Sequence, residues 1–453
     1  MQENKMGVMP VKKLIVSMSL PMMISMIVQA MYNIVDSIFV AQLSEQALTG
    51  VTLAFPMQNL MFAVVGGTGV GINAMLSKSL GEKENEAADS AAGNGLILNL
   101  IAAIIFMTAS FLGAAEAFIG TQTSDPVIMR EGTTYLSIVM VLSIGMASQV
   151  TLERLLQSTG RTIYTMITQA LGAIINIIMD PVMIFGLFGM PAMGVSGAAY
   201  ATIIGQSIAA VLALFFNITR NSDIRFSLHI LKLKAATVKR IYFVGVPSIL
   251  MIAIGSIMTY LMNKILSVFS STAVAVFGVY FKLQSFFFMP VFGLNNGVIP
   301  VLAYNYGAKN KSRIDEALKF SISLAFIIMC IGTLVFETIP GTLLNFFKAS
   351  EDMQAIGTVA LRVIAVHFPM AGLSIALGSI FQAFGRSFYS LIVSLGRQLF
   401  VLIPVAYVLS LFGNVDLVWW AFPIAEMVSL TLTLIFFKKL NREISAELAH
   451  NNG

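Results

Sequence analysis

Residues 14–40 read LIVSMSLPMMISMIVQAMYNIVDSIFV and contain a single charged side chain, Asp36. A helix of this length rises about 40 Å, which exceeds the roughly 30 Å hydrocarbon core of a bilayer. Lys5, Lys12 and Lys13 precede it. The apolar run is too long for the hydrophobic region of a signal peptide, and no A-x-A cleavage motif closes it. We therefore expect residues 14–40 to form a permanent membrane span.

Apolar runs of similar length continue along the whole chain. Of the 453 residues, 57% are hydrophobic and only 11% are charged, against about 25% charged residues in soluble domains. The pattern predicts an all-α integral membrane protein with twelve transmembrane helices. The expected spans are 14–40, 47–77, 93–118, 133–157, 163–188, 193–218, 241–268, 272–305, 316–340, 355–383, 389–412 and 415–437.

The basic residues gather in every second connection and in both terminal segments, as the positive-inside rule expects for cytoplasmic segments. The prediction is a multi-pass protein with both termini cytoplasmic. The net charge of +5 lies in these short loops, without a basic stripe interleaved with aromatics, so we expect no nucleic-acid partner. Cys330 is the only cysteine, which excludes an internal disulfide.

The two halves of the sequence resemble each other at a nearly constant offset. Segment 157–161 matches 382–386 at an offset of 225, and 187–189 matches 411–413 at 224. Earlier pairs stand 226 positions apart: Gln58 and Gln284, Gly71 and Gly297, Leu76 and Leu302, Gly81 and Gly307, Lys83 and Lys309, and Asp89 and Asp315.

The duplication predicts two pseudo-symmetric six-helix lobes. Because six is even, the second lobe enters the membrane in the same direction as the first, and a pseudo-twofold axis runs along the membrane normal. We assign residues 1–219 to the first lobe, 220–238 to a cytoplasmic linker and 239–453 to the second lobe. Such parallel repeats favour a transporter with a central substrate cleft over an enzyme.

One face of the first span is polar. Gln29, Tyr32, Asn33 and Asp36 are spaced i, i+3, i+4 and i+7, so they share one side of the helix. An ionisable group at bilayer depth is costly, which makes Asp36 a candidate functional residue.

The fifth span carries a second acid. Asn176 and Asp180 share a helix face, and Pro181 leaves the carbonyl of Ile177 without its helical partner. A free carbonyl beside a carboxylate and an amide oxygen suits a hard cation such as Na⁺. A purely structural carboxylate that pins one helix to another is the alternative for each acid.

The sixth span places Thr202, with Gln206 on its face, at a depth similar to that of the two acids. The second lobe has Met262 and Val405 at the positions equivalent to Asp36 and Asp180. The fold shared by the two halves therefore does not require these two carboxylates. No further metal site is predicted, and no cofactor beyond a coupling ion, H⁺ or Na⁺.

Polar and aromatic side chains in the second lobe are candidates for a substrate cleft. These are Lys282, Gln284, Phe287 and His367. Glu426 could titrate there, although a lone His or Glu more often makes a structural hydrogen bond.

In the first lobe, adjacent Glu153 and Arg154 are expected to form an ion pair. The run Gly66–Gly71 is not followed by Gly-Lys-Ser/Thr and predicts close helix packing rather than a phosphate loop.

Together, these motifs resemble the multidrug and toxic compound extrusion (MATE) family, in its prokaryotic DinF/MepA-like branch. The resemblance covers nearly the whole chain. Its carriers are Leu20-Pro21, the segment Met31-Tyr32-Asn33-Ile34-Val35-Asp36, the turn Gln157-Ser158-Thr159-Gly160-Arg161, the segment from Asn176 to Asp180-Pro181, and Gly194 to Thr202.

The resemblance implies a multidrug efflux antiporter of the bacterial plasma (inner) membrane, which exports amphiphilic, often cationic, drugs against inward H⁺ or Na⁺. It also implies a cation site formed by Asp36, Asn176, Asp180 and Thr202. The chain departs from the NorM-like branch, because residues 241–268 contain no acid. We expect a monomer whose partners are small-molecule drugs and membrane lipid.

Two alternatives stay open at this point. A flippase for lipid-linked precursors would need a basic cleft, for which Lys282, Arg362 and Arg397 are available. A membrane-embedded enzyme would need clustered catalytic groups, but the sequence has no HExxH motif and only three histidines.

Overall fold

The computed structural model describes residues 4–225, 231–347 and 349–450, and this part of the chain folds into helices without a strand. Ten of these helices are long and apolar enough to cross a membrane on their own. Two further pairs of helices would each cross it as one bent span, which gives the predicted twelve.

The helices divide into two groups that follow the chain order. The first group is α1 (Lys5–Val8), α2 (Val11–Ala41), α3 (Glu45–Gly81), α4 (Asn85–Phe111), α5 (Ala114–Gly120), α6 (Pro126–Val141), α7 (Ile144–Ser158), α8 (Thr162–Phe185), the short 3-10 turn η1 (Leu187–Gly189) and α9 (Val195–Arg220). The second is α10 (Ala235–Ser267), α11 (Ser271–Gly307), α12 (Lys311–Thr338), α13 (Pro340–Asn345), α14 (Glu351–Ala365), α15 (Phe368–Ala383), α16 (Ser387–Leu395), the π-helical turn η3 (Gly396–Leu402), α17 (Ile403–Ser410), α18 (Val415–Val418) and α19 (Ala421–His450).

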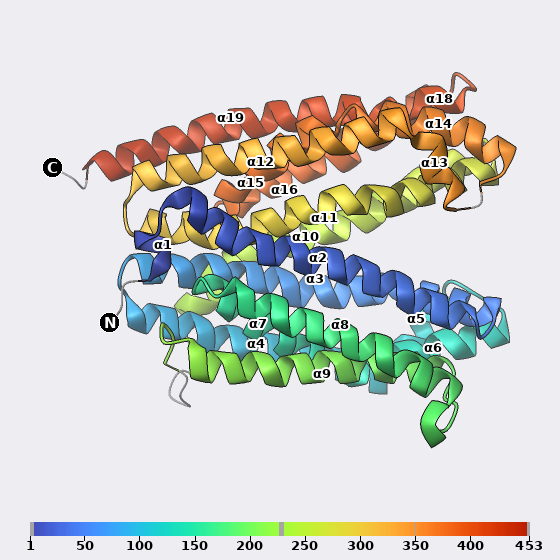
Figure 1. Ribbon diagram of the computed structural model, residues 1–453, viewed down its shortest axis with the longest axis horizontal. Coiled ribbons are helices and arrows are strands. Elements are labelled where there is room, and N and C mark those ends of the chain that lie inside the picture. Colours follow the sequence, from blue (N-terminus) through green and yellow to red (C-terminus); the bar gives the residue numbers. More distant parts are fainter. Residues whose placement is uncertain (1–3, 226–230, 348, 451–453) are drawn as a thin grey trace.

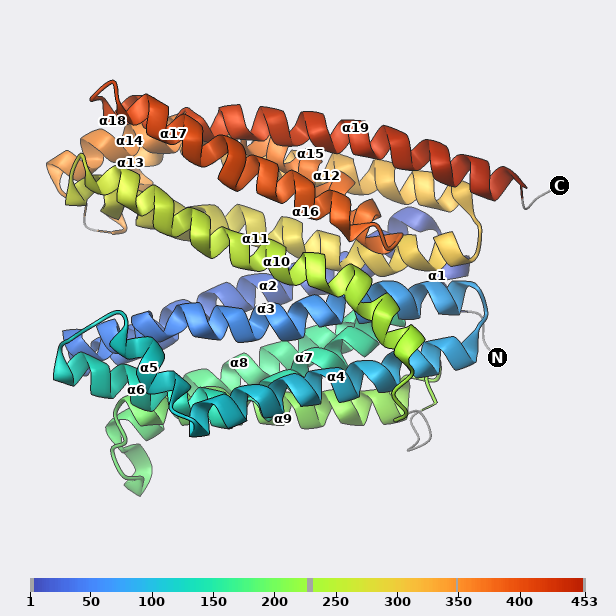
Figure 2. The same cartoon turned by 180° about the vertical axis from the view of Figure 1, so that it is seen from behind.

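The two groups form two lobes that lie side by side, with both chain ends at the same end of the bundle (Figures 1 and 2). We call this the terminal end, and the other the distal end. The segment between α9 and α10 crosses at the terminal end; residues 226–230 of the predicted linker lie outside the described residues.

Two predicted spans are broken in the structure. The predicted span 133–157 is α6 and α7, which meet at 51°, and the predicted span 355–383 is α14 and α15, which meet at 45°. The breaks, at 142–143 and 366–367, occupy equivalent positions in the two halves. At the first break, the Ser143 hydroxyl donates to the carbonyl of Ala103 at 3.1 Å, which satisfies a polar group inside the lobe. The apolar runs alone did not predict these bends.

Glycines bring the two lobes into backbone contact. A Cβ on Gly81 would lie 1.9 Å from the carbonyl oxygen of Tyr304, and one on Gly307 would lie 2.2 Å from that of Lys78. Lys78 and Gly81 are the repeat partners of Tyr304 and Gly307, so the contact is reciprocal about the pseudo-twofold axis. We call these contacts the glycine seam.

Further glycine contacts between the lobes extend the seam away from the terminal end. A Cβ on Gly67 would lie 2.4 Å from Ile249 Cγ1, and one on Gly293 would lie 2.6 Å from the Cα of Met23. Met23 and Ile249 are also repeat partners. Within the Gly66–Gly71 run, the predicted close packing is packing between lobes at Gly67 and at Gly71, where a Cβ would lie 2.1 Å from the carbonyl oxygen of Ile241; Gly69 packs instead against Arg154 of its own lobe.

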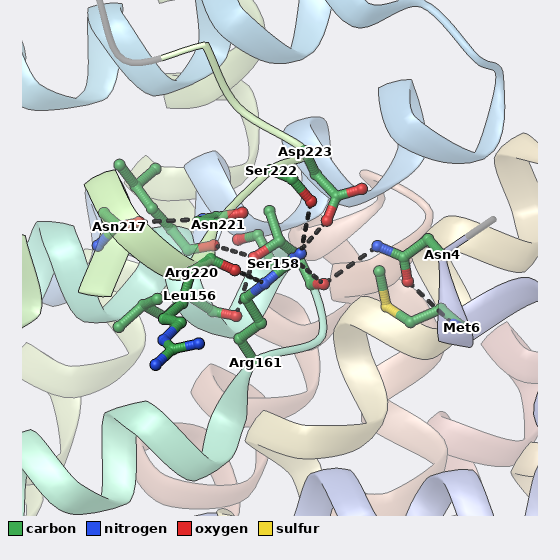
Figure 3. Close-up of polar contacts among 12 residues, drawn as sticks. Asn4, Met6, Leu156, Ser158, Arg161, Asn217, Arg220, Asn221, Ser222 and Asp223 are labelled. Atoms are coloured by element: carbon green, nitrogen blue, oxygen red, sulfur yellow. Dashed lines mark hydrogen bonds and ion pairs between the residues drawn. The ribbon is translucent and has the colours of Figure 1, made fainter. Parts of the chain in front are cut away.

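Helix α1 bridges the lobes at the terminal end. Asn4 Nδ2 donates to the carbonyl of Thr159 in the first lobe at 3.1 Å (Figure 3). From the second lobe, Asn305 Nδ2 donates to the Met6 carbonyl at 3.1 Å, and Arg313 Nη2 donates to the same carbonyl at 3.0 Å. We call this arrangement the α1 strap.

Beside the strap, Arg161 ties the α7–α8 turn to the end of α9. Its guanidinium donates to the carbonyls of Thr159 and Arg220 and to the Ser222 hydroxyl, and it forms an ion pair with Asp223 (Figure 3). Burial, together with the positive charge of Arg161, lowers the pKa of Lys5 below its usual value. The polar turn and the interlobe connection are therefore fixed to each other at the terminal end.

Candidate cation and substrate sites

Asp36 is the one charged group of α2 beyond its first turn, and it is buried. Its side chain is only 6% exposed, and its Oδ1 atom has no hydrogen-bond partner within the described part of the protein. One turn earlier Tyr32 is half-buried, whereas its neighbour Asn33 is exposed. The polar face of α2 therefore turns its acid inward, and one carboxylate oxygen is available to a ligand.

Asn176, Asp180 and Thr202 meet between α8 and α9. Asp180 is fully buried, and Asn176 and Thr202 are 2% and 5% exposed. With the amide of Asn176 oriented by its hydrogen bonds, the nitrogen donates to Asp180 Oδ2 at 3.3 Å. The amide oxygen then accepts from the backbone N–H of Thr202 at 3.1 Å and from its hydroxyl at 3.3 Å. These contacts hold Asp180 in a fixed direction.

The carboxyl groups of Asp36 and Asp180 lie close enough to interact with each other. Two carboxylates this close in a buried site repel each other unless a proton or a cation lies between them. Carboxylate, amide and hydroxyl oxygens are also ligands that a hard cation prefers. The arrangement can bind one positive charge in exchange for another.

Two further members of this cluster, Tyr135 and Gln58, were not among the residues predicted from the sequence. Gln58 Nε2 donates to the Tyr135 hydroxyl at 3.3 Å, and Tyr135 lies within electrostatic reach of Asp36. Gln58 could have been found, because it matches Gln284 in the repeat. Tyr135 carries no such signal, since only the folding of α6 onto α3 and α9 brings it to the site.

The supporting polar residues are placed differently from one another. Gln29 contacts the Tyr32 hydroxyl, beside Asp36. Gln206 Oε1 is buried without a hydrogen-bond partner within the described residues. Asn33 faces outward, and its carbonyl accepts a hydrogen bond from the Ser37 hydroxyl at 2.9 Å. Asn33 therefore lies outside the buried cluster.

The four candidates for a substrate cleft have different surroundings. Lys282 is exposed and lies over the ring of Phe347, with 6.0 Å between Nζ and the ring centroid. Phe287 packs towards α12, against Phe336. His367 is buried at the bend between α14 and α15, and Gln284 accepts a hydrogen bond of 2.7 Å from the hydroxyl of Tyr280.

The expected Glu153–Arg154 ion pair is wrong, because the two side chains point to different partners. Glu153 accepts hydrogen bonds from Thr168 at 2.9 Å and from Gln169 at 2.7 Å. Arg154 donates across the lobe interface to Asn296 Oδ1 at 3.2 Å. Adjacent residues on a helix point about 100° apart, so sequence neighbours rarely share a partner.

The second lobe holds a buried ion pair instead. Arg397 Nη1 donates to Glu426 Oε2 at 3.0 Å, and the Glu426 side chain is 2% exposed. Met262, the repeat partner of Asp36, is fully buried in the apolar core of this lobe. Buried charge in the second lobe is thus paired within the protein.

Comparison with known proteins places this chain in a family. The MatE family model matches residues 21–182 and again residues 247–408. The two matches begin at the same offset that separates Gln58 from Gln284 in the internal repeat. The chain is 27% identical to the multidrug export protein MepA of Staphylococcus haemolyticus, over 96% of this chain and 95% of the relative. It is 26% identical to a FAD transporter of Shewanella oneidensis, with 92% of each chain covered.

Solved structures agree with the sequence comparison. The outward-facing conformation of a multidrug resistance MATE family transporter superimposes with a TM-score of 0.92 at 25% identity, and 99% of each chain is covered. The predicted all-helical fold, with its MepA-like relatives, is thereby confirmed, and the alternative of a membrane-embedded enzyme is set aside. The chain belongs to the MatE family, the multidrug and toxic compound extrusion transporters.

Proposed function

We propose that this transporter exports amphiphilic cations across the bacterial plasma membrane, in exchange for H⁺ or Na⁺ bound at the Asp36–Asp180 pair. The observation that carries the proposal is the contact between two buried carboxyl groups, one of which has an oxygen without a partner. Multidrug export is the activity named for the MepA relative.

Exchange requires that the coupling ion binds the two states of the transporter with different affinity. The acids lie on α2 and α8, and α2 also packs against α11 of the second lobe. Binding of H⁺ or Na⁺ would remove the repulsion between the acids, and α2 could then repack against α8 and the second lobe. This links occupancy of the cation site to the substrate cleft between the lobes.

The proposed orientation places the terminal end in the cytoplasm. The Lys and Arg residues of this end support it, among them Lys78, Arg161, Arg220 and Lys309. With this orientation, the glycine seam and the α1 strap close the cytoplasmic side of the cleft. Both lobes belong to one chain, so we propose that a monomer is sufficient for transport.

An anionic cargo is the second candidate, because one relative is named a FAD transporter. A flippase of lipid-linked pyrophosphates would likewise need a basic cleft. Against this, Arg397 is paired with Glu426, and Arg362 donates to the Glu337 carbonyl at 3.2 Å. Of the three candidate cations, Lys282 and Arg362 are exposed and form no ion pair among the described residues, so only two of the three are available to an anion.

Purified protein in proteoliposomes tests the proposal. Export of a fluorescent aromatic cation is measured under a proton gradient and, separately, under a sodium gradient. We expect one gradient to drive export and Asp36→Asn to abolish it, with Ser37→Ala as the matched control on the same helix turn. Export by Asp36→Asn at the wild-type rate would reject Asp36 as a coupling residue. Transport of a flavin nucleotide but not of the cation would favour the second candidate.

A further inference from the structure

The second lobe contains a buried polar cluster that the proposed ion exchange does not use. Glu426 binds Arg397 through Oε2, but its Oε1 atom has no hydrogen-bond partner within the described part of the chain. The Ser374 hydroxyl lies beside this carboxylate. Buried polar atoms are nearly always satisfied, so the Oε1 atom of Glu426 points to a ligand.

The two members of the ion pair are buried to different degrees. The Arg397 side chain is 31% exposed, whereas that of Glu426 is 2% exposed. Arg397 also lies within electrostatic reach of Tyr280 and His367, so it points into the interior of the lobe. The guanidinium is therefore the more accessible of the two charged groups, and the carboxylate is the buried one.

The backbone under Arg397 is unusual as well. Arg397 lies in the π-helical turn η3, which interrupts the helical run from Ser387 to Ser410. Such widened turns recur at functional sites, because they rotate side chains out of the regular helical register. Here the turn directs a long cationic side chain across to α19.

Aromatic rings line the cluster. The ring of Phe422 lies 5.7 Å from that of Tyr280 and 6.0 Å from that of His367. The ring of Phe288 lies 6.1 Å from that of His367 on the other side. A carboxylate with aromatic rings nearby is the chemistry that recognises quaternary and alkylated ammonium groups.

The duplication places this cluster at the position of the cation site in the first lobe. Leu411 follows Leu187 by 224 positions, and at the same offset Glu426 is the repeat partner of Thr202. Thr202 belongs to the Asp36–Asp180 cluster. The same place in the frame therefore holds a cation site in one lobe and a carboxylate with an internal counterion in the other.

We propose that Glu426 binds the ammonium group of amphiphilic cations, and that Arg397 is the resident counterion that this group displaces. The inference rests on the proposed function in that it names the residue that recognises the exported cation. In the empty state Arg397 neutralises Glu426. On binding, the ammonium occupies Glu426 Oε1 and the aromatic walls, and Arg397 turns towards its exposed side.

Intrinsic fluorescence gives a direct readout of binding at this site. The protein has only two tryptophans, Trp419 and Trp420, which immediately precede α19, the helix that carries Glu426. The full chain in lipid nanodiscs is titrated with phenyltrimethylammonium, and in parallel with its neutral isostere tert-butylbenzene. We expect a saturable change in tryptophan fluorescence with the cation, and none with the isostere at equal concentration.

Two substitutions should act in opposite directions. Glu426→Gln should weaken binding of phenyltrimethylammonium by tenfold or more, because it removes the countercharge. Arg397→Gln should tighten binding severalfold, because it removes the internal competitor; Arg397→Lys, which keeps a smaller cation, should lie between it and the wild type. Thr431→Ala, on the exposed side of α19, is the matched control.

The opposite signs separate recognition from a structural role. If Glu426→Gln binds the cation as tightly as the wild type, the proposal is overturned. Weakened binding in Arg397→Gln would also overturn it. If the ion pair were purely structural, loss of either Arg397 or Glu426 would weaken binding of the cation. The titration needs no ion gradient, so a protein that binds through Glu426 but exports nothing would refute the proposed function alone.

Discussion

Around Asp36 and Asp180, the first lobe buries two carboxyl groups without a cation of its own, whereas the second lobe buries one carboxylate bound to an arginine. The two lobes share one frame, down to the bends at 142–143 and 366–367. The frame is therefore stabilised by apolar packing and glycine contacts, and the buried charges were free to differ. Under the proposed function the first lobe takes up an external positive charge, whereas the second lobe carries its own in Arg397.

Removing Arg397 should produce the largest loss of stability. Arg397→Gln leaves Glu426 as an unpaired buried charge, at an expected cost of about 3 kcal/mol. Glu426→Gln should cost less, because the guanidinium left behind is 31% exposed. The measurement is thermal unfolding in detergent, and the double substitution should restore most of the loss. A double variant no more stable than Arg397→Gln would show that the charges are not coupled.

A methyl group in the glycine seam should have the next largest effect. In Gly297→Ala the new Cβ would lie 2.6 Å from the Cα of Ser19, which forces the lobes apart at an expected cost of about 2 kcal/mol. Gly278→Ala, on the same helix, is the control, because nothing lies within 4 Å of its Cβ position. Unfolding in detergent and export should both distinguish the two variants. Equal behaviour would mean that the seam has no role in holding the lobes together.

Removing an acid from the first lobe should have the opposite sign. Asp180→Asn relieves the repulsion from Asp36 and should stabilise the protein by about 1 kcal/mol, while ion-driven export is lost. The measurement is unfolding in detergent without added sodium, at a pH where both acids ionise in water. A destabilised Asp180→Asn, in protein that still inserts into the membrane, would favour the alternative of a structural acid.

The α1 strap should give the smallest effect. Asn4→Ala removes one hydrogen bond to the first lobe and should cost about 1 kcal/mol in the closed terminal end, a roughly fivefold shift in population. Spin labels at Glu86 and Lys438, after Cys330→Ser, would report the distance between the lobes. An unchanged distance distribution would show that the strap does not restrain the lobes.

The sequence was sufficient for features that depend on local patterns. Run length and loop charge predicted twelve spans, and the spacing of Asp36, Asn176 and Asp180 predicted which helix faces are polar. Partners across the fold were not predictable. Arg154 reaches Asn296 in the other lobe, and Tyr135 reaches the acids, because of helix tilts and rotations that are set by packing between distant segments.

The glycine seam also has a mechanical consequence. Met23, at its inner limit, divides α2 into arms of about 18 Å and 27 Å, at 1.5 Å per residue. If α2 pivots there as a lever, a movement of about 2 Å at the strap becomes about 3 Å at the distal end. Because the glycines contact backbone rather than interlocking side chains, the two surfaces can separate without a change of rotamer. Rotation of α2 about Met23 should therefore have a low energy barrier.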